Sequence, residues 1–208
     1  MLSATKNKND SDFNKFLLST DYQAKQTGFI QPYADSPMDN EQVGEEVYIS
    51  MANKAEKYCW FMTPYLIITD EMTHALCLAA KRGVDVRIIT PGIPDKKMIY
   101  NITRSFYHGL VKHGVRIYEW TPGFCHAKMS VADDCMATCG TINLDYRSLY
   151  HHFENGCFMA DCQAVLDIRN DLAATMDECR EVTEQYSTGR SAYLRLGQLF
   201  MRLFAGLL

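Results

Sequence analysis

Residues 126–143 read HAKMSVADDCMATCGTIN, and the rest of the chain is organised around this stretch. It follows the pattern H-x-K-x4-D-x6-G-T-x-N. We predict a strand over residues 126–133, in which side chains two positions apart lie on one face. His126 and Lys128 then lie side by side, a nucleophile beside a cation, and a phosphate group fits against both.

The acidic pair that follows predicts a hairpin. Asp133 and Asp134 suit a tight turn, and residues 135–139 are expected to return as a second strand. The loop after that strand carries Thr141 and Asn143. The hairpin therefore brings a hydroxyl and an amide back towards the pocket beside the first strand.

Outside the hairpin, the apolar pattern alternates between helix and strand. Asp70, Asp95 and Asp161 are the expected helix N-caps, and Gly83 and Gly114 are expected to end two helices. Short alternating elements predict an α/β domain with layers around a buried sheet. The expected helices cover residues 41–57, 70–82, 95–113 and 162–185, and the expected strands cover residues 58–63, 84–90, 115–120 and 157–160.

The composition favours one globular domain with short tails. At 208 residues and 47% hydrophobic content, the chain is long enough for a sizeable core. Its formal net charge of −4 lacks the basic balance of a protein that follows a nucleic-acid backbone, so no nucleic-acid partner is expected. Most of the eight cysteines lie in apolar runs and are expected to be reduced thiols. Cys135 and Cys139 lack the spacing of a zinc site, and neither a metal nor another cofactor is expected.

The two ends differ from the centre. Residues 1–27 are polar and predict a mobile leader or linker, residues 28–186 form the expected domain, and residues 187–208 form an expected amphipathic helix. Arg195 and Arg202 belong to a narrow polar stripe on this helix, which either docks on the domain or lies in a membrane interface. The sequence has no signal peptide and no apolar run of the roughly 20 residues that span a bilayer. It leaves open whether its first residue is the native start or the edge of a longer reading frame.

The pattern in residues 126–143 resembles the HKD signature of the phospholipase D superfamily, with Thr141 where many members have Ser. From about Gly28 to Leu208 the chain is similar to bacterial cardiolipin synthases. The segments that carry this similarity are YADSP at 33–37, TPYLI at 63–67, AAKRGVDVRIITP at 79–91, GVRIYEWTPGF at 114–124 and NLDYRSLYHHFENG at 143–156. The resemblance implies a layered α-β-α sandwich with a mixed central sheet. It also implies the C-terminal half of a longer enzyme, whose first half carries transmembrane segments and another HKD motif.

The chemistry of a phosphodiester assigns a role to each motif residue. Neutral His126 attacks phosphorus and forms a phosphohistidine, and Lys128 and Asn143 hold the oxygens on which charge builds. Thr141 adds a hydroxyl donor. The resemblance implies that Glu154, in HHFENG, orients the catalytic histidine. No step needs a metal.

Four further residues are assigned to a structural role or to substrate binding. Asp133 lies at an odd offset from the lysine of the motif, so we expect it to hold the hairpin or an interface between two halves. Arg147, Tyr65 and His152 are candidate substrate-binding residues. The alternatives are an internal ion pair for Arg147, an ordinary strand-end aromatic for Tyr65 and a surface or core position for His152.

The reaction needs two histidines, one to attack and one to protonate the leaving group. The chain has six histidines but only one HxK, at His126, so we expect half of a site, completed by a homodimer or by a second HKD half. The predicted reaction, supported by the resemblance, joins two phosphatidylglycerol molecules into cardiolipin and releases glycerol. The alternatives are a homodimeric nuclease or phosphodiesterase and a silent half that binds a partner or a membrane surface. The expected location is the cytoplasmic side of a bacterial membrane, peripheral for this chain, since full-length relatives are membrane-anchored.

Overall fold

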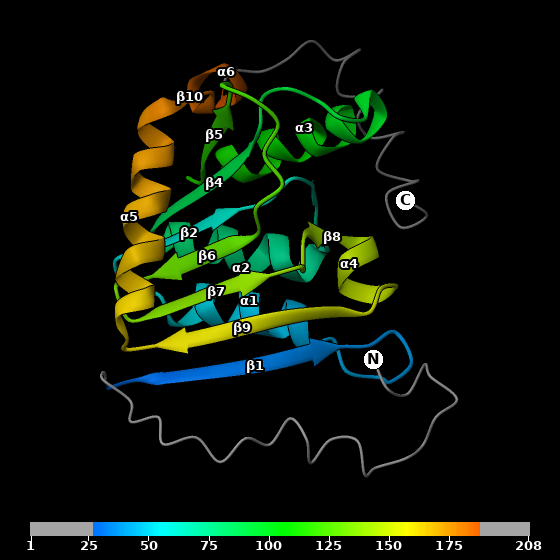
Figure 1. Cartoon of the computed structure of the whole chain (residues 1–208). Helices are drawn as coiled ribbons and strands as arrows, with labels where there is room; N and C mark the ends of the chain where they lie inside the picture. The colour runs from blue at the N-terminus through cyan, green and yellow to red at the C-terminus, as the bar shows by residue number, and fades with distance from the viewer. Residues whose placement is uncertain (1–26, 188–208) are drawn as a thin grey trace.

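The computed structural model describes residues 27–187 and contains an eight-stranded sheet in the order β1-β9-β7-β6-β2-β4-β5-β10 (Figure 1). The expected polar leader and the expected C-terminal helix lie outside the described residues. The strands are β1 (Phe29–Asp35), β2 (Tyr58–Met62), β4 (Asp85–Pro91), β5 (Arg116–Trp120), β6 (Met129–Ala132), β7 (Met136–Gly140), β9 (Glu154–Ala160) and β10 (Cys179–Glu181). A separate parallel pair joins β3 (Leu66–Ile67) to β8 (Leu144–Asp145).

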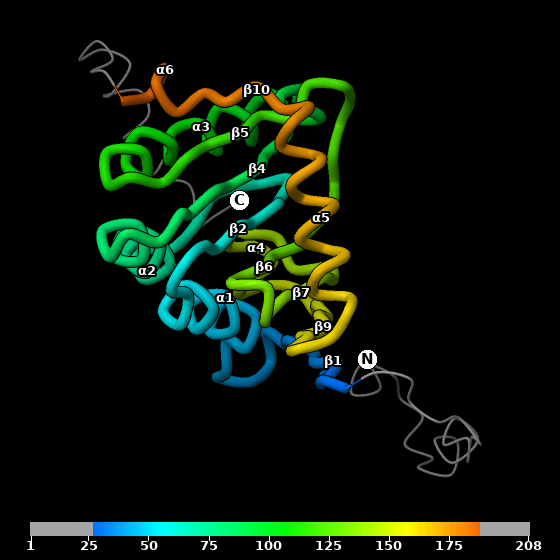
Figure 2. The backbone as a smooth tube through the Cα atoms, turned by 90° about the vertical axis from the view of Figure 1, so that its left-hand side faces the viewer, coloured from blue at the N-terminus to red at the C-terminus, as the bar shows by residue number. Residues whose placement is uncertain are grey.

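Helices cover both faces of the sheet and give three layers, as Figure 2 shows. On one face lie α1 (Val43–Lys54), α2 (Asp70–Lys81) and α3 (Lys97–Val111), and on the other lies α5 (Gln163–Glu178). Two short helices, α4 (Tyr146–Tyr150) and α6 (Thr183–Ser187), complete the described elements. The sheet is mixed: β2, β4 and β5 run parallel, and the other pairs in it are antiparallel. The predicted α/β sandwich with a mixed sheet is confirmed.

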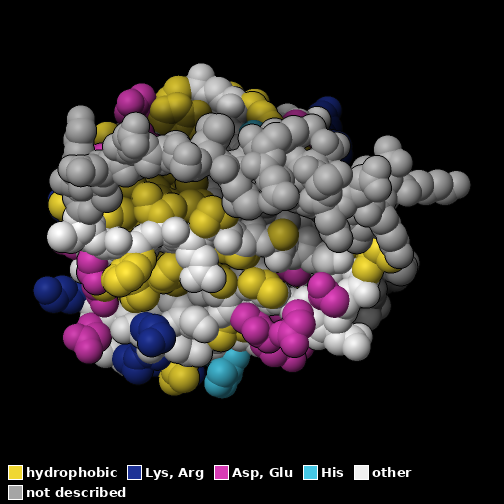
Figure 3. Space-filling view, turned by 60° about the horizontal axis from the view of Figure 1, so that its bottom comes forward, with side chains coloured by type: hydrophobic (Ala, Val, Ile, Leu, Met, Phe, Trp, Pro, Cys, Tyr) yellow, Lys and Arg dark blue, Asp and Glu magenta, His cyan; other side chains and the backbone are white. Residues whose placement is uncertain are grey.

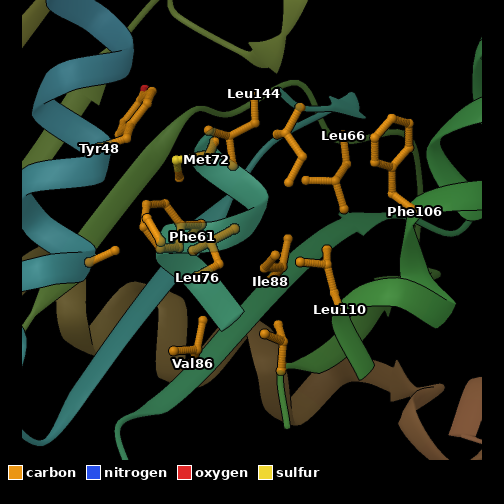
Figure 4. Close-up of a cluster of buried hydrophobic side chains, with 14 of the residues drawn as sticks. Tyr48, Phe61, Leu66, Met72, Leu76, Val86, Ile88, Phe106, Leu110 and Leu144 are labelled. Carbon is orange, nitrogen blue, oxygen red and sulfur yellow. The ribbon is translucent and has the colours of Figure 1, made fainter. Parts of the chain in front are cut away.

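The two-residue repeat of each strand divides the core between these layers. In β2, Cys59 and Phe61 point to the face of α1 and α2, whereas Tyr58, Trp60 and Met62 join the cluster under α5. Figure 4 shows part of the larger cluster, where side chains from the sheet meet those of the three helices. Because a central strand is apolar on both faces, YCWFM reads as a continuous hydrophobic run in the sequence.

The β6–β7 hairpin forms as predicted at its tip but is shorter at its base. Asp133 and Asp134 have φ angles of 53° and 60°, and the Cys135 N–H closes the turn on the Ala132 carbonyl at 3.1 Å. The strand begins only at Met129, so the prediction of a strand from residue 126 is wrong. His126 and Lys128 lie in the segment before β6, so the alternation of side chains along a strand does not determine their positions.

The helix predicted over residues 162–185 is also wrong at its C-terminal end. It stops at Glu178, and β10 then adds an edge strand antiparallel to β5. The fully buried Glu119 of β5 forms ion pairs with Arg104 at 3.0 Å and Arg180 at 2.5 Å, which ties β10 to α3 across the edge. A buried acid with two cationic partners is a tertiary feature that helical periodicity does not reveal.

The three predicted aspartate caps are corrected by the structure. Thr69, not Asp70, caps α2 by accepting from the Met72 N–H at 3.0 Å. The N-caps of α3 and α5 are Lys96 and Cys162, neither with a capping side chain. The expected helix ends at Gly83 and Gly114 are confirmed, since both have positive φ angles, of 94° and 99°.

The strand β1, which the sequence pattern did not predict, forms one edge of the sheet. Its first residues are open to solvent, with Phe29 and Ile30 76% and 61% exposed. Figure 3 shows the face on which β1 runs, where hydrophobic and acidic side chains both gather. Further along the strand, the Tyr33 ring lies over Gly156 of β9, only 2.3 Å from where a Cβ would be. Glycine at that position is therefore a packing requirement.

Candidate active site

His126 and Lys128 meet in the segment between β5 and β6. The Lys128 ammonium lies 2.8 Å from His126 Nδ1 and 2.6 Å from the His126 carbonyl oxygen. Lys128 is only 8% exposed. The ammonium also lies 3.3 Å from Nε2, and because an ammonium nitrogen only donates hydrogen bonds, the ring nitrogen that binds it accepts and carries no proton. The imidazole is therefore neutral.

The pKa values of both groups are shifted towards the neutral forms. Partial burial and the Lys128 ammonium lower the pKa of His126 from 6.5, and Asp95 opposes this shift. Burial lowers the pKa of Lys128 from 10.5, while the carboxylates of Glu154 and Asp145 offset part of that effect. At neutral pH the imidazole is consequently uncharged, the form in which a histidine can act as a nucleophile.

Two aromatic rings flank the imidazole. The Tyr65 ring meets it edge-on with centroids 6.2 Å apart, and the Phe124 ring lies 5.9 Å away on a tilted plane. The Tyr65 hydroxyl donates to the Asp95 carboxylate at 2.5 Å, which ties the segment after β2 to the start of α3. The Tyr65 ring therefore lies beside the His126 imidazole, whereas its hydroxyl is bound to Asp95.

The loop after β7 brings Thr141 and Asn143 to the same place. The Asn143 amide nitrogen has one long contact, 3.5 Å to the Asp145 carboxylate, and its Oδ1 is buried without a partner among the described residues. Thr141 accepts from the Asn155 N–H at 3.0 Å and donates to the Glu154 carboxylate. The Asn143 amide nitrogen can therefore donate further hydrogen bonds, whereas the Thr141 hydroxyl already both donates and accepts one.

Glu154 opens β9 and contacts two residues other than the expected one. Its carboxylate accepts from Thr141 and lies 3.4 Å from His152 Nδ1. Within residues 27–187 no hydrogen bond joins it to His126, so its predicted role in orienting that histidine stays a prediction. Glu154 does act on the site electrostatically, because its charge raises the pKa of Lys128.

A pocket of about 330 Å³ joins these groups at the end of the sheet where β2, β4 and β7 stop, and residues of α3 and α4 also line it. All eight residues predicted to react with or bind the substrate line it. They are Tyr65, His126, Lys128, Thr141, Asn143, Arg147, His152 and Glu154. The carboxyl ends of parallel strands are a common place for a ligand site in an open α/β sheet.

The structure places Asp133 away from this pocket, at the hairpin tip. Its carboxylate accepts the backbone N–H groups of Glu56, Lys57 and Tyr58 at 2.7, 2.9 and 2.9 Å. Although burial opposes ionisation, these donors hold the pKa of Asp133 below its usual value. Asp133 ties the hairpin that follows His126 and Lys128 to the start of β2.

Sequence reasoning missed several pocket residues from neighbouring elements. Asp145 is buried, caps α4 by accepting from the Ser148 N–H at 2.8 Å, and has a pKa raised by burial. Lys96 enters from the loop before α3. Ile67, Ile99 and Tyr146 supply the apolar lining. The cap signal at Asp145 was readable in the sequence, but nothing local indicates that residues near 67 and 96 reach the same pocket.

The described part of the chain holds no group of three or more His, Cys, Asp or Glu side chains suited to a metal ion. Over the same residues, no helix is both long and apolar enough to cross a bilayer. The pocket combines a neutral imidazole, a buried cation and an amide donor. Such a set can bind an anionic phosphodiester and attack it.

Solved structures share this fold. The crystal structure of Nuc, a phospholipase D family member from Salmonella typhimurium, superposes with a TM-score of 0.63 and 16% identity, covering 74% of this chain and 98% of that one. Phosphatidylserine synthase of Haemophilus influenzae gives a TM-score of 0.66 and 16% identity, covering 86% of this chain and 47% of that one. At these identities the likeness concerns the fold.

Curated proteins add similarity in sequence. An uncharacterized protein of Streptococcus mutans is 47% identical over 205 residues, covering 99% of this chain and 44% of that protein. Cardiolipin synthase of Halalkalibacterium halodurans is 32% identical over 184 residues, covering 88% of this chain and 37% of that protein. The chain thus spans less than half the length of either relative. Residues 48–176 match the family of the cardiolipin synthase, PLD-like domain, and the chain therefore belongs to this phospholipase D-like family.

Proposed function

We propose that this chain supplies one HKD half of a phosphatidyl-transfer site that makes cardiolipin and glycerol from two molecules of phosphatidylglycerol. One observation carries the proposal: the neutral His126 imidazole lies 2.8 Å from the buried Lys128 ammonium, in a pocket shared with the Asn143 amide. The similarity to curated cardiolipin synthases supports the choice of substrate.

In the first step, a His126 ring nitrogen attacks the phosphorus of phosphatidylglycerol. A P–N bond forms and the P–O bond to the headgroup glycerol breaks, so the departing oxygen must receive a proton from a general acid. Lys128 and Asn143 donate to the non-bridging oxygens, where negative charge increases in the transition state. The attacking nitrogen must be free of Lys128, so we expect the phosphate oxygens to replace the ring as acceptors of that ammonium.

In the second step, a hydroxyl of another phosphatidylglycerol attacks the phosphohistidine. The P–N bond breaks, a P–O bond forms, and the hydroxyl proton passes to the group that served as the acid. The imidazole is regenerated, and the number of phosphodiester bonds is unchanged over the cycle. No metal or redox partner is needed to balance these steps.

The acid is expected to come from a second HKD half. His152 is the other histidine in the pocket, and it faces Glu154 at 3.4 Å with a side chain 49% exposed. His126 has no carboxylate acceptor among the described residues, although a nucleophilic imidazole needs one nitrogen protonated and held. A facing copy of this chain, or another HKD half, supplies both the acid and the missing environment. The membrane surface presents the lipids.

The test is incubation of the protein with vesicles of labelled phosphatidylglycerol, together with a measurement of its mass in solution. Cardiolipin and glycerol should appear in equal amounts and disappear with His126→Ala. His74→Ala, which removes an exposed histidine on α2 outside the pocket, is the matched control and should keep the activity. Full turnover by a strict monomer would refute the half-site. Cleavage of DNA without lipid transfer would refute the lipid substrate.

A further inference from the structure

The pocket is lined by more cationic side chains than carboxylates. Lys96, Lys128 and Arg147 line it together with only two carboxylates, Asp145 and Glu154. The chain as a whole has a formal net charge of −4, so the excess of cations in the pocket is opposite in sign to the net charge of the chain. An anion that enters the pocket meets an attractive field.

Both carboxylates already have partners. Asp145 accepts from the Ser148 N–H, and Glu154 accepts from Thr141 and faces His152. Among the described residues, neither carboxylate has an oxygen within 4.0 Å of a side-chain nitrogen of Lys96, Lys128 or Arg147. The acidic groups are therefore engaged by neutral donors and one histidine, and they do not neutralise the cations by direct contact.

The three cations differ in how they are held. The Lys128 ammonium is bound to the His126 ring and carbonyl and belongs to the reacting centre. The charged groups of Lys96 and Arg147 have no hydrogen-bond or ion-pair partner within residues 27–187, and both side chains are exposed at the pocket wall. These two cations are free to bind a ligand.

Lys96 and Arg147 approach the pocket from different elements. Lys96 is the N-cap residue of α3, and Arg147 lies in the first turn of α4. Apolar side chains from β3, α3 and α4 share the pocket with them, namely Ile67, Ile99 and Tyr146. The pocket thus offers cations on two walls and an apolar lining, which suits a phosphate joined to a short carbon linker and an acyl-bearing glycerol.

We infer that Lys96 and Arg147 form a second phosphate subsite, which binds the phosphodiester of the acceptor lipid and not the phosphate that reacts. This inference rests on the proposed transfer, because cardiolipin carries two phosphates joined through one glycerol. The reacting phosphate is held by His126, Lys128 and Asn143. The acceptor phosphate then lies one glycerol away, and its binding aims the attacking hydroxyl at the phosphohistidine. Lys96 acts as a specificity residue that favours an anionic acceptor over a neutral alcohol.

The first test is binding of glycerophosphoglycerol, the soluble deacylated headgroup, measured by calorimetry on the whole chain. Lys96→Ala and Arg147→Ala should each weaken this binding roughly tenfold, as expected for loss of a charge-assisted contact. Lys97→Ala is the matched control, because it removes the adjacent exposed lysine, which does not line the pocket, and should leave binding unchanged. An equal loss of affinity in all three variants would overturn the subsite. So would unchanged affinity in all three. Inorganic phosphate bound as tightly as the headgroup would overturn its assignment to a diester.

The second test is competition between acceptors in one reaction, with phosphatidylglycerol vesicles and ethanol present together. The ratio of cardiolipin to phosphatidylethanol does not depend on the amount of folded enzyme. It should fall roughly tenfold with Lys96→Ala and stay at the wild-type value with Lys97→Ala. An unchanged ratio with Lys96→Ala overturns the inference and leaves the proposed function intact. If wild type forms neither product, the proposed function fails, and the binding test alone decides whether an anion site exists.

Discussion

The three backbone contacts of Asp133 allow a stability prediction whose parts can be separated. Each N–H donor is partly solvated, so we assign about 0.5 kcal/mol per contact and about 1.5 kcal/mol for the loss of all three. The φ angle of 53° adds about 1 kcal/mol when alanine replaces aspartate. Asp133→Ala should therefore lower the free energy of unfolding by about 2.5 kcal/mol.

Two further substitutions at the same position divide this loss. Asp133→Gly removes the carboxylate but accepts the left-handed backbone, so it should cost about 1.5 kcal/mol. Asp133→Asn keeps one acceptor oxygen and tolerates the backbone, so it should cost about 1 kcal/mol. The free energies come from urea denaturation at a common slope. A loss below about 0.5 kcal/mol for Asp133→Ala would refute the reasoning, as would equal losses for all three variants.

The same contacts make the stability depend on pH. The folded pKa of Asp133 lies below 3.8, so the unfolded chain binds the proton more readily. The stabilisation is then present above pH 3.8 and is lost as the pH falls through the folded pKa. Denaturation curves recorded from pH 7 downwards should show the gap between wild type and Asp133→Asn closing in acid. A gap that widens in acid would contradict the assignment.

Three further predictions concern the active site and the packing. The NMR titration of His126 should have its midpoint below 6.5, and Lys128→Met, which removes one of the causes of that shift, should raise the midpoint; an unchanged midpoint would count against their contact. Gly156→Ala should cost about 2–3 kcal/mol, since a Cβ there lies 2.3 Å from the Tyr33 ring, and Tyr33→Ala should relieve part of that loss, whereas strictly additive losses would argue against the clash. Glu119→Ala should cost about 3 kcal/mol in urea denaturation, because it leaves two arginines without their buried carboxylate, and a loss under about 1 kcal/mol would contradict this role.

Local patterns predicted the elements that lie inside the sheet better than those at its edges. The strand at residues 58–62 and the helix that ends before Gly83 were readable because apolar period, turn residues and length agree there. The edge strands β1 and β10 were not. The first four residues of β1 are all exposed, and β10 has only three residues, so neither carries an apolar signature. Their pairing depends on β9 and β5, which lie far away in the sequence.

In the candidate site, too, the sequence predicted some features and missed others. The residue types at His126, Lys128, Thr141 and Asn143 were recognisable from their spacing, and the pocket contains all four. The route by which they meet was predicted wrongly, since β6 begins after Lys128. Side-chain reach, and not strand alternation, brings the ammonium to the imidazole.

By itself, the sequence determined the chemistry available to this protein: a histidine, a lysine and an amide at fixed spacing, in a chain with one such motif. Only the tertiary structure decided which groups Glu154 contacts, that Asp133 is bound to the start of β2, and that Lys96 and Arg147 reach one pocket. The physical reason is the range of the signals. Periodicity and turn chemistry act over a few residues, whereas these contacts depend on strand order and on loops that join elements distant in the chain.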